Sequence, residues 1–198
     1  MTLSALLTID ATLAKHGVHP MTSWWHDQLT TFYDGGYRRF VGRVGRGGTK
    51  SHVAAKVAMA ETLGHEWHVP PGERHYFAFV SQNKPEAGQR LAQLQHWLTA
   101  IGVPHDRRGD AIDLDGLPLG FRVFACQVGA VSGFRAIGFV CDELAKWHSD
   151  GVNPAAEVVT SLRAMCVTHP DAIEWFISSA YSKRDYHYQL VEEALAAA

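Results

Sequence analysis

The sequence predicts an α/β fold with a central, mainly parallel sheet that is covered by helices on both faces. Strand-like apolar segments alternate with segments whose apolar residues recur at helical spacing, which is the pattern of strand–helix–strand crossovers. Residues 136–141 (AIGFVC) form a continuous apolar run, as expected of a parallel strand buried on both faces. A glycine-rich segment, residues 45–48, joins a predicted strand to a predicted helix. Ligands of such sheets bind beyond the carboxyl ends of the strands, so we expect the functional residues there.

The first elements surround the glycine-rich segment. Residues 4–15 are expected to form a short helix, and residues 38–44 a strand that leads into the glycines. The next helix begins at about Lys50, keeps apolar residues at helical spacing and ends at Gly64, because glycine is a common C-terminal stop.

The middle of the chain contains a strand, a helix and a hairpin. Residues 75–81 (HYFAFVS) form the second predicted strand. A helix follows from about Pro85 to Gly102, since proline is favoured in the first helical turn and glycine after the last. An Asp-Gly pair between residues 111–114 and 121–126 is the turn signal of a β-hairpin.

The end of the chain repeats the helix–strand–helix order after the apolar strand. A helix begins near Pro154 with Asn153 as its N-cap. Residues 174–178 form another strand, and Asp185 can cap a last helix.

Composition indicates one globular domain. The chain has 198 residues, 46% hydrophobic and 19% charged. A formal net charge of −2 means that any contact with nucleic acid is local or shared among copies of the chain. Three cysteines without C-x-x-C spacing argue for a reducing compartment and against disulfides or a cysteine zinc site. The chain shows no run of about 18 apolar residues and no signal-peptide order at its start, so we expect a cytoplasmic protein without a membrane span.

The glycine-rich segment has the residue types of a phosphate-binding loop. Small residues allow backbone N–H groups to turn toward an anion, a lysine reaches the outer phosphates, and a hydroxyl at the helix start binds magnesium. The glycines are Gly45, Gly47 and Gly48. Lys50 and Ser51 supply the ammonium and the hydroxyl, whereas Thr49 stands where the usual Walker A pattern has glycine. The alternative is an ordinary glycine-rich turn before a helix.

Two acids end the apolar strand, about 90 residues after the loop. Asp142 and Glu143 follow residues 136–141 in the order of a Walker B pattern. Asp142 would hold magnesium through water, and Glu143 would polarise the attacking water. Acids at the end of a strand are also common as helix caps or solvated groups, so the position relative to the loop carries the prediction.

Further polar residues complete the candidate site. Ser178 and Ser179 follow the next strand and can sense an outer phosphate through water, although a serine-rich strand exit is the simpler reading. Gln28 precedes the loop by about 20 residues, and its amide can pair with an adenine edge. The adjacent Trp24 and Trp25 can stack on a base or pack in the core.

Taken in order, these elements resemble the ATPase domain of a bacteriophage terminase large subunit, over about residues 21–188. The family's Walker A often begins with arginine, as Arg46 does here, and its approach to Walker B is rich in Ser, Gly and Arg, as residues 129–135 are. The family's "coupling" motif would be Ser178, Ser179 and Ala180. The resemblance implies a P-loop NTPase fold of the ASCE type, with Lys50, Arg46 and Glu143 as catalytic residues.

The resemblance also implies a function and partners. We expect an ATP- and Mg²⁺-dependent motor that feeds double-stranded viral DNA into a procapsid in the host cytoplasm. The expected partners are portal protein, the small terminase subunit and further copies of the chain in a ring. The expected single domain has an adenine-side helical segment at 1–36, a P-loop core at 37–185 and a C-terminal helix at 186–198. That helix would begin the link to the family's nuclease domain, which we expect to be absent from this chain.

Other readings remain open at this stage. One is a helicase-like or small-acceptor kinase of the P-loop class, and another is a nucleotide-binding module whose altered loop no longer supports hydrolysis. Arginines also gather near the loop, namely Arg38, Arg39, Arg43 and Arg46. They can neutralise phosphates, contact DNA or remain solvated, and the sequence does not separate these roles.

Overall fold

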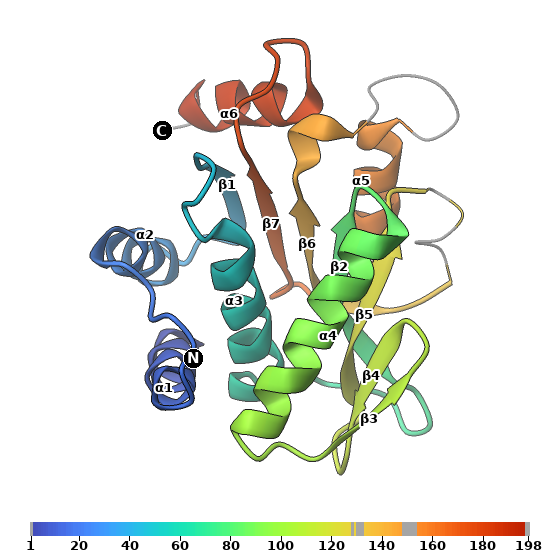
Figure 1. Ribbon diagram of the computed structural model, residues 1–198. Coiled ribbons are helices and arrows are strands. Elements are labelled where there is room, and N and C mark those ends of the chain that lie inside the picture. The colour runs from blue at the N-terminus through green and yellow to red at the C-terminus, as the bar shows by residue number, and fades with distance from the viewer. Residues whose placement is uncertain (1, 128, 130–132, 148–153, 197–198) are drawn as a thin grey trace.

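The computed structural model describes residues 2–127, 129, 133–147 and 154–196. This part of the chain forms a seven-stranded sheet with the strand order β1-β7-β6-β2-β5-β4-β3 (Figure 1). The strands are β1 Arg39–Arg43, β2 His75–Ser81, β3 His105–Arg108, β4 Ala111–Leu114, β5 Leu119–Ala125, β6 Ala136–Asp142 and β7 Ile173–Ser178. The first five in the spatial order run parallel, and β4 and β3 extend the sheet as an antiparallel hairpin. The predicted α/β fold with a mainly parallel sheet is therefore confirmed.

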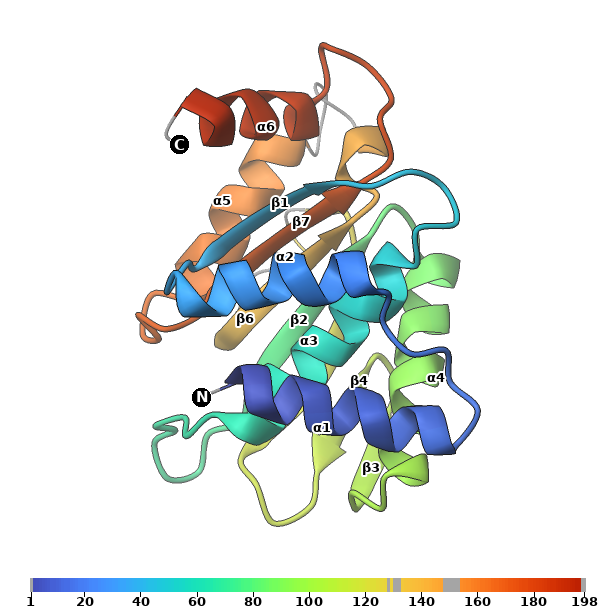
Figure 2. The same cartoon turned by 90° about the vertical axis from the view of Figure 1, so that its left-hand side faces the viewer.

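Helices cover both faces of this sheet (Figures 1 and 2). They are α1 Thr2–Lys15, α2 Ser23–Asp34, α3 Lys50–Gly64, α4 Lys84–Ala100, α5 Ala155–Met165 and α6 Tyr186–Ala196, with a 3₁₀ turn η2 at Leu144–Lys146. One buried hydrophobic cluster packs the four helices α1, α2, α3 and α4 on one face of the sheet, and a second packs α5 and α6 on the other face. Strand β6 is buried along its whole length because its side chains alternate between the clusters, with Val140 in the first and Phe139 in the second.

The two N-terminal helices, α1 and α2, lie on the outside of the face of the sheet that α3 and α4 also cover (Figure 2). Helix α1 packs closely on α3, since a Cβ placed on Gly64 would lie only 2.4 Å from the Cβ of Ala5. A buried ion pair between Lys56 of α3 and Asp10 of α1 joins the same two helices. Helix α2 packs Phe32 edge-on against Trp175 of β7, with the ring centroids 5.3 Å apart. The described helices include none that is both long and apolar enough to cross a membrane.

One local prediction needs correction, and one strand was not predicted. The N-cap of α5 is Pro154, which makes no side-chain capping bond, and Asn153 lies outside the described residues. Strand β3 was not predicted, because its sequence HDRR is polar throughout and lacks the apolar alternation of a half-buried strand. Pairing with β4 holds it at the edge of the sheet. The remaining predicted strands and helices lie within a few residues of their expected bounds, and Asp185 caps α6 by accepting a 2.7 Å hydrogen bond from the Tyr188 N–H.

Candidate functional site

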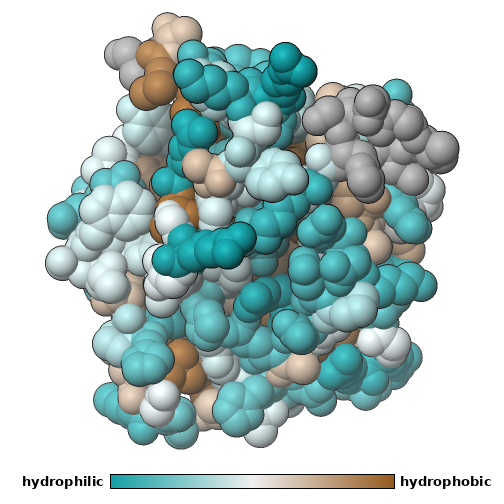
Figure 3. Space-filling view, turned by 45° about the horizontal axis from the view of Figure 1, so that its top comes forward, coloured by the Kyte–Doolittle hydropathy of each residue, from teal (hydrophilic) through white to brown (hydrophobic). Residues whose placement is uncertain are grey.

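The carboxyl ends of β1, β7 and β6 lie side by side at one edge of the sheet, at the top of Figure 1. Because β7 lies between β1 and β6, the loop after β1 and the acids after β6 flank the end of β7. The Val44 N–H donates a 3.0 Å hydrogen bond to the Ser178 carbonyl, which ties the start of the loop to the end of β7. Figure 3 brings this edge forward and shows a mostly hydrophilic surface there.

The loop between β1 and α3 has the backbone conformation of a tight turn. Gly47 has φ +80°, and Thr49 has φ 52° and ψ 17°, which is left-handed and unusual for a β-branched residue. Side chains placed on Gly45 or Gly47 would meet nothing within 4 Å, so the loop is open to solvent at both positions. A Cβ on Gly48 would instead lie 2.5 Å from Val44 Cγ1. Thr49 thus adopts the left-handed conformation that glycine adopts more easily.

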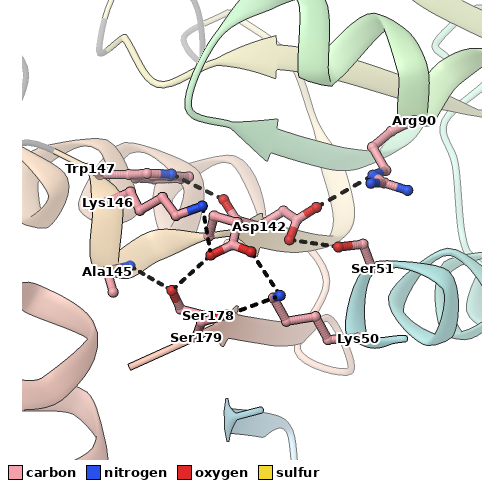
Figure 4. A network of polar contacts seen from close by, with 10 residues as sticks. Lys50, Ser51, Arg90, Asp142, Ala145, Lys146, Trp147, Ser178 and Ser179 are labelled. Carbon is pink, nitrogen blue, oxygen red and sulfur yellow. Dashed lines mark hydrogen bonds and ion pairs between the residues drawn. The ribbon is translucent and has the colours of Figure 1, made fainter. Parts of the chain in front are cut away.

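Lys50 begins α3 and points into the site (Figure 4). Its side chain is only 10% exposed, and its Nζ lies 2.7 Å from Glu143 Oε1. The same ammonium donates a 3.3 Å hydrogen bond to Ser179 Oγ. Lys50 therefore connects the loop, the end of β6 and the end of β7.

Ser51 and Asp142 form a second contact across the site. Ser51 Oγ donates a 3.0 Å hydrogen bond to Asp142 Oδ1, and Arg90 Nε of α4 lies 3.4 Å from Asp142 Oδ2 (Figure 4). Burial raises the pKa of the Asp142 carboxyl above its ordinary value, although Arg90 and the Ser51 hydrogen bond oppose this effect. A hydroxyl and a carboxylate at this distance are oxygen ligands of the kind that Mg²⁺ prefers.

Glu143 lies at the centre of the charged network. Its backbone is left-handed, with φ 55°, and its Oε2 accepts contacts from Lys146 Nζ at 3.4 Å and Ser178 Oγ at 3.4 Å. Burial acts to raise the pKa of this carboxyl, but Lys50 and Lys146 outweigh burial and hold the pKa below its ordinary value. Glu143 is therefore ionised at neutral pH in this arrangement.

The two serines at the end of β7 make different contacts. Ser178 is fully buried and also accepts a 3.1 Å hydrogen bond from the Ala145 N–H, so it joins β7 to the turn after β6. Ser179 contacts Lys50, as described above, whereas Ala180 is exposed beyond the end of the strand. The structure thus brings both serines, but not Ala180, into the polar network.

Gln28 and the tryptophans lie on α2. Gln28 lines a cavity of about 580 Å³ between α2, β1 and α6, together with Phe40 and Leu190. Trp25 is buried in the core, which is one of the two roles expected for it, but its Nε1 also donates a 2.9 Å hydrogen bond to the Gly48 carbonyl. Trp24 is half-exposed.

The arginines near the loop differ from one another. Arg38 pairs with Asp171 and Arg39 with Glu174 at the opposite end of β1 and β7, and Arg43 lies over the ring of Tyr188. Arg46 is exposed in the loop, and no ion pair to it is found within the described residues. Arg46 is therefore the member of this group that can turn to a ligand without breaking an internal contact.

Sequence reasoning missed two residues and one contact at the site. Arg90 carries no motif and comes from the middle of α4, Lys146 follows the acids by three residues, and the Trp25 indole bond depends on a contact across 23 residues. Only Lys146 gives a local signal, since a cation three residues after Glu143 is within reach in a helical turn.

Comparison with known protein families and with curated proteins gives no match. Solved structures do match. The large terminase of bacteriophage HK97 aligns with a TM-score of 0.77 over 100% of this chain and 42% of that protein, at 12% identity. The large terminase ATPase domain of Thermus phage P74-26 aligns with a TM-score of 0.56 over 77% of this chain and 63% of that domain, at 13% identity. The large terminase of a second thermophilic bacteriophage aligns with a TM-score of 0.57 over 88% of this chain and 42% of that protein, at 19% identity.

These alignments bear on the fold, because the sequence identities are low and the chain spans less than half of the HK97 protein. They agree with the resemblance expected from the sequence motifs. The chain has the fold that is found in the ATPase domains of phage large terminases.

Proposed function

We propose that this chain is an ATP-hydrolysing motor domain that powers translocation of double-stranded viral DNA into a procapsid. One observation carries the proposal. Lys50, Ser51, Asp142 and Glu143 form one polar network at the carboxyl edge of a sheet with the terminase ATPase fold. In α/β sheets this edge is where ligands bind.

The residues present fit Mg²⁺ bound together with a nucleotide. Ser51 and Asp142 offer one hydroxyl and one carboxylate. This is a small set of ligands, and the described residues contain no group of three or more His, Cys, Asp or Glu side chains that could hold a metal ion by themselves. Mg²⁺ typically takes one or two protein ligands and completes its shell with water and substrate phosphates. When bound, it would neutralise charge on the phosphate oxygens.

The loop fits the phosphates of ATP. Its open backbone at Gly45 and Gly47 and the start of α3 offer N–H groups and a helix N-terminus to an anion. Lys50 would turn from Glu143 to the outer phosphates, because a phosphate competes for the same ammonium. The base would lie in the cavity lined by Gln28, whose amide offers both a donor and an acceptor to adenine.

Hydrolysis then needs a positioned water and stabilised charge. Glu143, held by Lys146 and Ser178 after Lys50 has turned away, would orient and polarise the attacking water. The water oxygen forms the new bond to the terminal phosphorus as the bond to the ADP oxygen breaks, and the water proton passes to the Glu143 carboxylate. Arg46, exposed and without an ion pair to the described residues, is available to the developing negative charge.

The packaging role extends the proposal to partners. In this proposal the chains form a ring on the portal protein in the host cytoplasm, and the small terminase subunit supplies the DNA. A ring agrees with the net charge of −2 of a single chain. One near-neutral copy makes few phosphate contacts, whereas a ring sums one small basic patch per copy around the DNA.

The hydrolytic core of the proposal is tested by ATPase assays of Lys50→Ala beside the control Lys84→Ala. Lys84 is an exposed lysine on α4 and has no ion pair within the described residues. We expect Lys50→Ala to abolish hydrolysis with a native fold, and Lys84→Ala to hydrolyse ATP normally. Unchanged hydrolysis by folded Lys50→Ala protein would reject the assignment of the loop.

The motor role is tested by the ATPase rate against protein concentration, with and without duplex DNA at low salt. We expect a low rate for the isolated chain and a higher rate on assembly or with DNA. DNA-independent transfer of phosphate to a small acceptor would instead indicate a kinase-like enzyme, and tight ATP binding without turnover would indicate a binding module.

A further inference from the structure

We infer that Trp25 is a positioning residue of the phosphate loop, which sets the orientation of the Gly48–Thr49 peptide. The inference rests on the proposed nucleotide site and adds a residue outside the loop to it. Trp25 lies in the first turn of α2 and is 1% exposed. Its Nε1 donates to the Gly48 carbonyl at 2.9 Å, across 23 residues of sequence.

The geometry of the peptide unit turns this contact into a directional one. A trans peptide holds its C=O and N–H in opposite directions, and no peptide bond in the described chain is cis. When Trp25 binds the Gly48 oxygen on one side, the Thr49 N–H must therefore point to the other side, away from α2. That N–H immediately precedes Lys50 and the first N–H groups of α3.

The same peptide orientation appears in the backbone angles. Thr49 is left-handed at φ 52°, and the helical residue Lys50 follows it. Successive residues with left- and right-handed backbones gather their N–H groups into a concave anion site. A β-branched residue rarely adopts the left-handed region without support, whereas glycine adopts it readily. Trp25 supplies the support at the position where the usual loop has glycine.

Neighbouring residues leave little freedom for another arrangement. Gly48 has no room for a side chain, because Val44 Cγ1 and the Gly45 oxygen lie 2.5 and 3.1 Å from where its Cβ would be. The Trp25 ring is itself fixed, with its centroid 6.0 Å from that of Phe40 on β1. The indole N–H is thus held by packing, and the loop carbonyl is held by the indole.

The experiment measures the affinity for MgADP, by calorimetric titration, in Trp25→Phe, in Trp25→Phe with Thr49→Gly, and in Trp67→Phe. Trp67 is the matched control, because its Nε1 also donates a 2.9 Å hydrogen bond to a backbone carbonyl, that of Glu61, near the other end of α3. We expect Trp25→Phe to weaken binding about fivefold, the typical value of one hydrogen bond. Thr49→Gly should restore most of that loss, and Trp67→Phe should bind as the unchanged chain does.

The other outcomes overturn either this inference alone or the inference together with the proposed function. Equal affinity of a folded Trp25→Phe protein overturns the inference alone, and so does a loss that Thr49→Gly does not rescue, since Trp25 would then act through general packing. If Trp25→Phe does not fold, hydrogen exchange of the Trp25 indole N–H in the unchanged chain with MgADP decides. Slow exchange supports the bond to Gly48, and free exchange overturns it. An unchanged chain that binds no nucleotide overturns the proposed function and this inference together.

Discussion

Replacement of Lys56 by methionine tests how α1 is attached to the rest of the fold. The Lys56 side chain is 1% exposed, and its Nζ donates to Asp10 Oδ1 at 2.5 Å and to the His19 carbonyl at 2.7 Å. Both carboxylate oxygens of Asp10 also accept from the Met21 N–H, at 3.2 Å. Methionine has a similar length and helix propensity, so Lys56→Met removes the charge with little other change.

The expected loss is large, because Asp10 would remain buried without its lysine, and its remaining basic contact, from the partly exposed His26, is at 3.9 Å. Breaking a buried ion pair at one member costs about 3–5 kcal/mol. The double variant with Asp10→Asn removes both charges, and its amide oxygen can still accept from Met21. We expect it to lose only about 1–3 kcal/mol, for the His19 carbonyl that lacks its donor. The double variant should therefore be more stable than Lys56→Met alone.

Urea unfolding followed by circular dichroism measures these differences. With a slope of about 2 kcal/mol/M, a loss of about 4 kcal/mol lowers the midpoint by about 2 M. Lys15→Met, at an exposed lysine at the end of α1, is the control and should change stability by less than about 0.5 kcal/mol. If Lys56→Met lost less than about 1 kcal/mol, or if adding Asp10→Asn made it worse, the buried pair would not hold the two helices in the manner described.

Four further outcomes are expected. Glu143→Gln should bind ATP but hydrolyse it about 10²-fold more slowly or worse, as single-turnover kinetics would show, and a loss of binding at a normal rate would contradict the role assigned to Glu143. Arg46→Ala should lower turnover far more than nucleotide affinity, by about 10³-fold or more, and if neither changed, Arg46 would be a solvated charge. Asp142→Asn should raise the Mg²⁺ concentration needed for half-maximal hydrolysis, and an unchanged magnesium curve would remove Asp142 from the metal site. The pKa of Glu174 is lowered in the folded chain, because the hydrogen bonds and charges of Arg163 and Arg39 outweigh the effect of burial. Its contribution to stability is therefore fully present above the ordinary pKa of about 4.3, and it is lost as the pH falls through the lower folded value. The stability difference between the unchanged chain and Glu174→Gln, measured by urea unfolding, should accordingly be present at pH 7 and shrink below about pH 4; a difference independent of pH would refute this account.

The sequence predicted the elements whose physics is local. Strand β6 was visible because a strand buried on both faces is apolar at every position, and the loop after β1 because glycines cluster where the backbone turns sharply. Strand β3 was invisible for the converse reason, since an edge strand is defined by its partner and not by its own side chains.

The candidate site divides in the same way. Lys50, Ser51, Asp142 and Glu143 come from two short motifs, and the expectation that strand ends meet at one edge was enough to bring them together. The contribution of Arg90 could not be predicted, because nothing near it in sequence shows that α4 packs beside the end of β6. The indole hydrogen bond of Trp25 could not be predicted, because a core position explains the ring but does not show which carbonyl its N–H reaches.

Strand β1 has β7 as its sole hydrogen-bonded neighbour in the described sheet, and this has a mechanical consequence. The start of the loop that follows β1 is attached to the sheet through the backbone bond from the Val44 N–H to Ser178. The start of the loop, β1 and β7 are thus connected in series, and a displacement there reaches the end of β7 before any other strand, and then the segment that leads to α6. At the other end of the loop, Lys50 and Ser51 contact Glu143 and Asp142, so the start of α3 is coupled directly to the end of β6. The two ends of one loop therefore act on two neighbouring strands.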